Sequence, residues 1–284
     1  MPLKELEWID FLSEKARPGK SAIVGIGDDC ALVRVGKEKL LLKSDIFVEG
    51  VHFKLKNISF KDIGKRAVAR VFSDFAACCG VPKFIGVSAG IPSRIKEKDL
   101  KQILEGILSI CRKYNASLVG GDTSKSTKLI LDIWGVGQAY KCILRSTAKT
   151  GDYIFLTGKL GKRDFNKPFE PRINEAKELV KKFKVNSMID VSDGFVIDLH
   201  RILKASKKGA VIFKDDIPTT KGLSDFYRGE DYELIFTVDK LEKKLPILMK
   251  KYYLAGRIKS HAFGFKWESN GKLKEVKVKG FTHF

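Results

Sequence analysis

The chain has 284 residues and a formal net charge of +20, from 54 Lys and Arg against 34 Asp and Glu. With 44% hydrophobic and 31% charged residues, its composition is typical of a globular protein and excludes a disordered chain. No apolar run approaches the roughly 18 residues of a membrane span, and the acidic, amphipathic first segment excludes a signal or transit peptide. We therefore predict a cytoplasmic protein with no membrane partner.

The excess of positive charge has three interpretations: a solvated lysine-rich surface, binding to nucleic acid, or capture of an anionic small substrate. The basic residues stand singly or in pairs, such as Lys181-Lys182 and Lys250-Lys251, so we expect no nucleic-acid partner. The five cysteines form no C-x-x-C pair and the four histidines no H-x-x-x-H motif. We therefore predict reduced thiols and no zinc site.

Hydrophobic periodicity and turn residues predict alternating helices and strands. The first half predicts, in chain order, a helix at 3–16, strands at 22–26, 31–35 and 39–42, a helix at 59–79, a strand at 83–89, a helix at 96–114, and strands at 116–119 and 128–139. After the polar segment 145–152, the second half predicts a strand at 153–157, a helix at 174–183, a strand at 187–191, a helix at 192–205, strands at 210–214 and 232–238, a helix at 240–250, and closing strands.

This order of elements predicts an α/β (α+β) fold of two domains, 1–140 and 141–284, at about 150 residues per domain. In the first domain, the two long helices at 59–79 and 96–114 are expected to cover one face of a sheet. No internal repeat of solenoid or propeller length is present.

Several strand-like runs end in glycine or aspartate, in the segments IVGIGDD, LLLKSD, LVGGD and MIDVSDG. A buried strand that ends in a carboxylate holds a hard oxygen ligand on a rigid element, and adjacent glycines let a phosphate approach the backbone. Carboxylates brought together repel each other unless cations lie between them, as in Mg²⁺ sites that carry polyphosphate. The alternative is that each Asp and Gly is an ordinary turn residue.

Asp74 adds a further carboxylate, on or beside the core-facing stripe of the helix at 59–79. Burial of its charge requires either a basic or backbone partner or a metal ion. The usual nucleotide-binding motifs are missing, because Cys30 interrupts the dinucleotide pattern and Glu14 stands where a P-loop needs its first glycine. If the protein uses ATP, metal ions and scattered polar groups must hold the phosphates.

Taken in order, the sequence resembles the thiamine-monophosphate kinase family, of the superfamily that includes aminoimidazole ribonucleotide synthetase. The resemblance spans almost the whole chain, through GIGDDCAL, KSDIFVEGVHF, RAVARVFSDFAACCGVPKFIGVSAGIP, LVGGDTSKS, LRSTAKTGDYIFLTG, MIDVSDGFVIDLHRI, GEDYELIFTV and GFTHF. It implies phosphorylation of thiamine monophosphate to thiamine diphosphate with ATP. It also implies a homodimer that associates through the sheet of an N-terminal ATP- and metal-binding domain, and a C-terminal domain that completes the active site.

The resemblance also implies roles for individual residues. The implied Mg²⁺ ligands are Asp28, Asp29, Ser44, Asp45, Asp74, Asp122, Asp190 and Asp193. The implied ATP contacts are Gly121, Asp122, Arg145 and Ser192, and the implied thiamine-phosphate contacts are His52, Glu230 and Phe281. Asp45, Asp122 and Arg145 are the implied catalytic residues, because phosphoryl transfer between two anions mainly needs charge neutralisation and alignment. For His52, Glu230 and Phe281 an ordinary core, surface or turn role remains the alternative.

The chain departs from the family at Lys43, near Leu104, where a tyrosine that often lies against the nucleotide is replaced, and in two shortened segments. Lys43 stands where the family has Thr or Ser, which removes a metal-ligating hydroxyl and places a cation beside the metals. The segments 159–171 and 216–229 are shorter than usual. These segments are expected to enclose the substrate, so the difference bears most on substrate specificity. The alternatives are a sister synthetase acting on aminoimidazole ribonucleotide or selenophosphate chemistry and, from another class, a basic nucleic-acid-binding protein.

Overall fold

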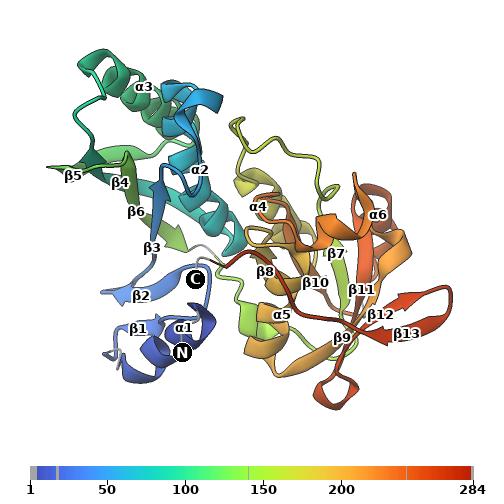
Figure 1. Ribbon diagram of the computed structural model, residues 1–284. Helices are drawn as coiled ribbons and strands as arrows, with labels where there is room; N and C mark the ends of the chain where they lie inside the picture. The colour runs from blue at the N-terminus through green and yellow to red at the C-terminus, as the bar shows by residue number, and fades with distance from the viewer. Residues whose placement is uncertain (1–4, 17–18, 140, 241, 283–284) are drawn as a thin grey trace.

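The computed structural model describes residues 5–16, 19–139, 141–240 and 242–282. Figure 1 shows two halves, one blue to green and one yellow to red, each built on its own β-sheet. The first sheet lies within residues 22–139 and the second within 153–275. Among the described residues, no helix has both the length and the apolar character needed to cross a membrane.

The first sheet has six strands in the order β1-β2-β3-β6-β4-β5. Its strands are β1 (Ala22–Val24), β2 (Ala31–Val35), β3 (Glu38–Val48), β4 (Gly80–Ile91), β5 (Ser117–Lys125) and β6 (Ile130–Ala139). All neighbours are antiparallel except β4 and β5, which run parallel with the register Ser88↔Asp122. Because β5 pairs only with β4, one of its edges stays open within the described chain.

Two long helices cover one face of this sheet, as the sequence predicts (Figure 1). Helix α2 (Phe60–Ala77) packs against β3, β4 and β6, and α3 (Glu97–Lys113) packs against α2 and β5. Ser59 begins α2, because its side-chain oxygen accepts a hydrogen bond from the backbone N–H of Asp62 at 3.1 Å. Gly64 and Gly106 let the two helices approach closely, since a Cβ at either would meet the other helix's backbone at about 2 Å.

The second sheet has seven strands in the order β13-β12-β9-β11-β7-β10-β8. Its strands are β7 (Tyr153–Leu156), β8 (Val185–Asp190), β9 (Lys208–Phe213), β10 (Leu234–Val238), β11 (Tyr253–Ser260), β12 (Phe265–Ser269) and β13 (Lys272–Glu275). The helices of this half are α4 (Ile173–Lys182), α5 (Phe195–Ser206) and α6 (Leu245–Lys251). The short helices are η1 (Leu55–Asn57), η2 (Arg145–Thr147), η3 (Lys214–Asp216), η4 (Gly222–Tyr227) and η5 (His261–Phe263).

The two halves meet through α2, which packs on one side against the first sheet and on the other against α4 and β8. One hydrophobic core therefore runs from Phe72 and Phe75 on α2 to Met188 on β8 and Phe236 on β10. The N-terminal helix α1 (Glu5–Lys15) adds a further link, because Asp10 binds Lys204 of α5 at 2.7 Å. Side chains on the inner face of α2 thus stand at the junction of the halves.

Several predicted bounds are corrected by the structure. The predicted strand at 116–119 continues to Lys125 because β5 pairs with β4 along its whole length. The predicted helix at 240–250 begins only at Leu245, because Pro246 lacks the N–H that a helix interior requires. The start of the predicted helix at 3–16 lies outside the described residues, and its described part spans Glu5–Lys15.

The hypothesis that the aspartates stand at strand ends is correct for Asp190 and wrong for two others. Asp190 is the last residue of β8. Asp45 lies within β3 and Asp122 within β5, because the pairing of each strand continues past the aspartate. Asp28 follows β1 in a turn. The carboxylates are therefore placed by strand faces and turns as well as by strand ends.

Candidate functional site

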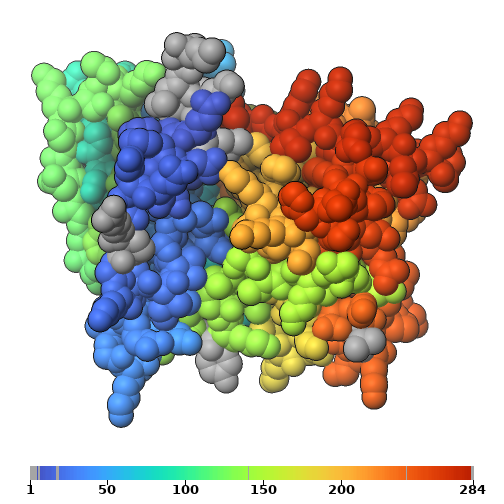
Figure 2. All heavy atoms as spheres, turned by 90° about the horizontal axis from the view of Figure 1, so that it is seen from below, coloured from blue at the N-terminus to red at the C-terminus, as the bar shows by residue number. Residues whose placement is uncertain are grey.

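A cavity of about 1180 Å³ lies between the two halves. It is lined by residues of β1 and the turn after it, β3, α2, η2, the β8–α5 connection, α5 and the segment before β10. Figure 2 shows the blue N-terminal segment lying between the green part of the first half and the orange and red second half. Most of the aspartates singled out by the sequence line this one cavity.

Three buried carboxylates from both halves of the chain meet in the cavity. Asp29 follows β1, Asp74 lies on α2 and Asp190 ends β8, and one oxygen of each lies within 4.8 Å of the others. Their exposed fractions are 2%, 8% and 1%. Ser73 donates a hydrogen bond to Asp190 Oδ2 at 2.5 Å, whereas the buried Asp190 Oδ1 has no hydrogen-bond partner among the described residues.

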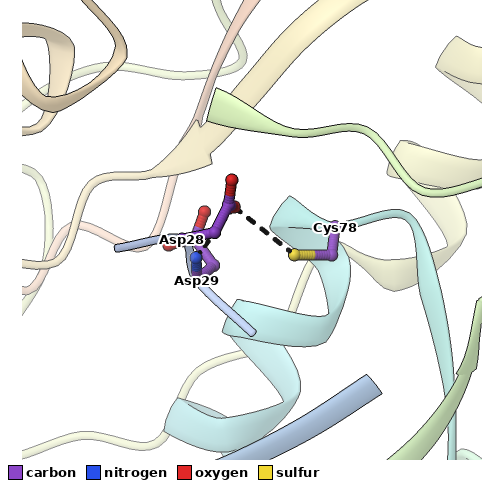
Figure 3. A group of neighbouring side chains, drawn as sticks. All are labelled: Asp28, Asp29 and Cys78. Carbon is purple, nitrogen blue, oxygen red and sulfur yellow. Dashed lines mark hydrogen bonds between the residues drawn. The ribbon is translucent and has the colours of Figure 1, made fainter. Parts of the chain in front are cut away.

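The turn after β1 brings a second group together, drawn in Figure 3. Asp28, Asp29 and Cys78 each place a ligand atom within 4.8 Å of the others, and the Cys78 thiol donates to Asp28 Oδ1 at 3.9 Å. Arg145 of η2 ties this turn to the second half: its backbone N–H donates to Asp28 Oδ2 at 2.9 Å, and its guanidinium forms a salt bridge with Asp29. Gly27 allows the turn because its φ of +121° lies in the region that favours glycine.

Lys43 and Arg70 are two further cations that contact carboxylates of the cavity. Lys43 on β3 places its ammonium 3.1 Å from Asp74 Oδ2. Arg70 on α2 binds Asp45 through Nε at 3.0 Å, and it also reaches Glu230 Oε1 at 3.2 Å. Asp45 is therefore bound by the Arg70 guanidinium. In the cluster of three carboxylates, Lys43 binds Asp74 and Arg145 binds Asp29.

Burial and mutual repulsion disfavour the charged form of the clustered carboxylates. Burial, followed by the Asp29 charge, raises the pKa of Asp28 to about 7 and that of Asp190 to about 8. Burial also raises the pKa of Asp29 and of Asp74 above their usual range. Burial acts on Asp45 in the same direction, but Arg70 and Lys43 outweigh it and lower the pKa of Asp45. The cluster therefore attracts a cation or protons.

A pH-dependent stability is expected from the raised pKa of Asp190. A carboxyl whose pKa rises from 3.8 to about 8 on folding stabilises the fold most below pH 3.8, and that contribution is lost as the pH rises through about 8. In metal-free protein, the melting temperature of Asp190→Asn relative to the unsubstituted chain should therefore increase as the pH rises from 3.8 to about 8. Added Mg²⁺ should counteract this increase by stabilising the unsubstituted chain more. A pH-independent difference in thermal melts would contradict this expectation.

The implied thiamine contacts lie at the same cavity. His52, Glu230 and Phe281 all line it. His52 Nδ1 accepts a hydrogen bond from the backbone N–H of Val48 at 2.9 Å, which orients the ring. Glu230 has φ of +63°, and its backbone N–H donates to Ser192 at 2.7 Å. The Phe281 backbone N–H donates to the Asp193 carbonyl at 2.9 Å, which brings the C-terminal segment to the cavity.

The β8–α5 connection supplies Ser192 and Asp193, which also line the cavity. Asp193 binds Arg201 of α5 at 2.7 Å. The fully buried Asp198 accepts hydrogen bonds from the backbone N–H groups of Asp193 and Gly194, both at 3.0 Å, and so holds the connection in place. Asp198 was not singled out from the sequence, although its position in the first turn of a helix is typical of a group that binds free N–H donors.

Sequence reasoning also missed Phe165, Arg70 and Tyr232, which all line the cavity. The loop that carries Phe165 folds back onto α2, where the Phe165 carbonyl accepts a hydrogen bond from the buried Arg66. Arg228 places its guanidinium 3.9 Å from the centre of the Phe165 ring. No local sequence signal marks these residues, because the contacts join segments more than 60 residues apart.

Gly121 and Asp122 are not brought to the cavity. Both are exposed on β5, at the open edge of the first sheet. The ladder places Asp122 beside Ser88 and Asp132 on the sheet face that α2 and α3 leave uncovered. Ser44 lines the cavity and donates a hydrogen bond to Asp132 Oδ1 at 2.7 Å.

The donor set of the cavity fits Mg²⁺. Mg²⁺ prefers carboxylate and other hard oxygen ligands and is usually bound through a few carboxylates together with substrate phosphates. Asp29, Asp74 and Asp190 supply such oxygens, and the buried Oδ1 of Asp190, which has no hydrogen-bond partner among the described residues, is suited to bind a cation. A divalent cation at this cluster would relieve the repulsion that raises the carboxyl pKa values.

Comparisons with known proteins show which family this chain resembles. Residues 27–139 match the family described as AIR synthase related protein, N-terminal domain. The chain is 36% identical to the thiamine-monophosphate kinase of Buchnera aphidicola subsp. Schizaphis graminum and 32% identical to that of Bacillus subtilis. These alignments cover 100% and 99% of this chain, respectively, and 100% of each relative.

Solved structures share the fold over the whole chain. The structure of AaThiL complexed with AMPPCP and TMP superposes with a TM-score of 0.84 at 27% identity, covering 100% of this chain and 99% of that one. A chain of the HypE-HypF complex has a TM-score of 0.76 at 18% identity, covering 96% of this chain and 99% of that one, which is a likeness of fold alone. The fold is therefore that of the aminoimidazole ribonucleotide synthetase superfamily, and the full-length identity to its relatives shows that the chain belongs to the thiamine-monophosphate kinase family.

Proposed function

We propose that this chain transfers the γ-phosphoryl group of ATP to thiamine monophosphate, producing thiamine diphosphate and ADP. One observation supports the proposal beyond family membership. Buried carboxylates suited to Mg²⁺, which in turn binds phosphate, line the same cavity as His52, Glu230 and Phe281. The AaThiL structure supports this pair of substrates, because it contains the ATP analogue AMPPCP together with TMP.

In this proposal Mg²⁺ would be held by Asp28, Asp29, Asp74 and Asp190, and Asp45 and Asp193 also line the cavity. Bound Mg²⁺ neutralises the charge of the phosphates that approach one another. Arg145, fixed by Asp29, presents a half-buried guanidinium beside the carboxylates, where it would bind the ATP phosphates together with Ser192. The carboxylates and Arg145 thus align two anions that otherwise repel.

The reaction needs no strong general base. An ionised phosphate oxygen of thiamine monophosphate forms a bond to the γ-phosphorus of ATP, while the bond from that phosphorus to the β–γ bridging oxygen breaks. The electron pair of the broken bond leaves with ADP. Because the attacking oxygen is already ionised, the chain's task is to align the reactants and to exclude water.

The thiazolium ring of the substrate is positively charged, so an acid and aromatic faces suit its end of the cavity. Phe165→Ala should raise the KM for thiamine monophosphate by about 10-fold and change kcat less than about 2-fold, because the ring contributes uniform binding of the substrate. The KM for ATP should stay constant. Phe263→Ala, outside the cavity lining, is the matched control. A large fall in kcat at unchanged KM would contradict a substrate-binding role for Phe165.

We also propose a homodimer that associates through the first sheet. On the uncovered face, the apolar side chains of Leu42, Ile46 and Phe84 are 38%, 48% and 47% exposed. Several exposed apolar side chains on one face are typical of a protein–protein interface. The same face carries Asp122, which lies outside the cavity of its own chain. A partner subunit docked on this face would bring the partner's Asp122 toward Ser44 and the metal-binding cavity, so that two chains complete each site.

Domain roles and location follow from the same proposal. Residues 1–140 would bind ATP and metal and form the dimer, and residues 141–284 would complete the active site. A cytoplasmic location is supported by the five cysteines, all described and all free of disulfides, as expected in a reducing compartment.

The decisive experiment incubates the folded protein with ATP, Mg²⁺ and thiamine monophosphate and measures thiamine diphosphate through its fluorescent thiochrome derivative. We expect thiamine diphosphate and ADP in equal amounts, and none without Mg²⁺. A folded protein that forms no thiamine diphosphate would refute the proposal and favour a sister synthetase. A nucleic-acid-binding protein would instead show binding that falls steeply with salt and is indifferent to Asp45→Asn.

A further inference from the structure

Lys43 occupies an unusual place for an ammonium group. It lies within β3 between two residues whose side chains face the other side of the sheet, so its own side chain points toward α2. Its side chain is only 25% exposed, and its Nζ lies 3.1 Å from Asp74 Oδ2. Asp74 is itself one of the three clustered carboxylates. The ammonium therefore stands at the carboxylate cluster rather than on the solvated surface.

The charge of Lys43 acts on the whole cluster. Burial is the largest cause of the raised pKa of Asp29 and of Asp190, and Lys43 is among the groups that oppose the rise in both. The nearby guanidinium groups are committed elsewhere, Arg70 to Asp45 and Glu230, and Arg145 to Asp29. For Asp74, Lys43 is the salt-bridge partner among the described residues.

An ammonium and a divalent ion compete for the same carboxylate oxygen. Both are cations, both require oxygen atoms at close range, and at a shared oxygen they repel each other strongly in a poorly solvated site. The lysine is covalently tethered, so it reaches Asp74 without the entropy loss that a free ion pays on binding. The ammonium supplies one positive charge and no coordination geometry, which is enough to neutralise one carboxylate.

We propose that the Lys43 ammonium is a built-in cation that takes the place of one divalent ion at Asp74, so that this chain binds fewer divalent ions than it would with a neutral residue at position 43. The inference rests on the proposed function only in taking the cavity as a divalent-metal site. Lys43 is then a positioning residue that occupies one of the cation positions at Asp74, so that fewer divalent ions share Asp74 with Asp29 and Asp190.

The test counts bound ions directly. Mn²⁺ binds the same oxygen ligands as Mg²⁺, and electron paramagnetic resonance distinguishes free from bound Mn²⁺. Full-length protein with Lys43→Thr or Lys43→Met is expected to bind about one more Mn²⁺ per chain than the unsubstituted protein, or to bind its last ion at least about 10-fold more tightly. Lys43→Arg, which keeps the charge, should retain the lower count. Lys39→Thr, an exposed lysine on the same strand, is the matched control.

Each outcome decides between the possibilities. Equal counts and affinities in Lys43→Thr, Lys43→Met and the unsubstituted chain, with folding verified by circular dichroism, would overturn the role of Lys43 and leave the kinase proposal standing. Loss of Mn²⁺ binding in Lys43→Met would also overturn it, because the lysine would then be assisting the metal. Absence of Mn²⁺ binding in the unsubstituted protein would overturn both this inference and the metal-binding cavity. An extra ion in both neutral variants, absent from Lys43→Arg and Lys39→Thr, would support it.

Discussion

Replacing Asp29 by Asn is expected to lower kcat by about 10²- to 10³-fold while leaving the protein folded. Asp29 belongs to both carboxylate groups of the cavity and holds the Arg145 guanidinium. The substitution keeps the shape of the side chain but removes a negative charge. That charge would hold the cations that neutralise the transferred phosphoryl group. The loss should therefore fall on the transition state, with little change in the KM for thiamine monophosphate.

Steady-state kinetics by the thiochrome assay measure this effect, and thermal melts verify the fold. In metal-free protein Asp29→Asn removes a buried charge from a repelling cluster and also the salt bridge to Arg145, so we expect it to fold with a lowered melting temperature. Asp215→Asn is the matched control, because Asp215 is exposed and its carboxylate accepts a hydrogen bond from Ser269 outside the cavity lining. A near-normal kcat for Asp29→Asn would refute the role of the cluster in phosphoryl transfer.

Asp122→Asn is expected to reduce turnover comparably, although Asp122 lies outside the cavity of its own chain. In the proposed homodimer, Asp122 on the open strand β5 serves the site of the partner subunit. The exposed position of Asp122 means that the substitution should leave stability within about 0.5 kcal/mol. Activity and stability should therefore separate cleanly in this variant.

Subunit mixing tests where Asp122 acts. If each site combines Asp29 of one chain with the partner's Asp122, then a heterodimer of the Asp29→Asn and Asp122→Asn chains contains one intact site. Mixing the two inactive variants and allowing exchange should restore about a quarter of the unsubstituted activity, because random exchange makes half of the dimers mixed and each has one of two sites intact. No restoration, in a mixture shown to exchange subunits, would refute the shared site.

The predicted fold class was correct because its signals are local and strongly periodic. The amphipathic stripe of α2 and the N-cap at Ser59 are visible in the sequence, and the structure places α2 and α3 on one sheet face as expected. The bounds of β5 and α6 were less accurate. Strand length depends on pairing with a neighbour that is distant in the chain, and the short α6 begins where Pro246 permits.

The candidate site was predictable in kind and not in arrangement. The aspartate-bearing segments and the resemblance pointed to a metal and phosphate site, and the cavity brings most of those residues together. The sequence did not show that Phe165 would line this cavity, because the loop that carries it is anchored by a contact to Arg66 on α2. It also left open whether a base or a metal would meet Asp74, and the structure places Lys43 there.

The sequence by itself determined which chemical groups this protein contains: the aspartates that can serve as hard oxygen ligands, and the family's ordered motifs. Only the tertiary structure decided which of these groups meet. Asp29, Asp74 and Asp190 are more than 40 residues apart in the chain and converge because α2 packs against both halves. Asp122 carries a family motif yet faces an uncovered sheet surface, since its place depends on strand order, which local sequence does not encode.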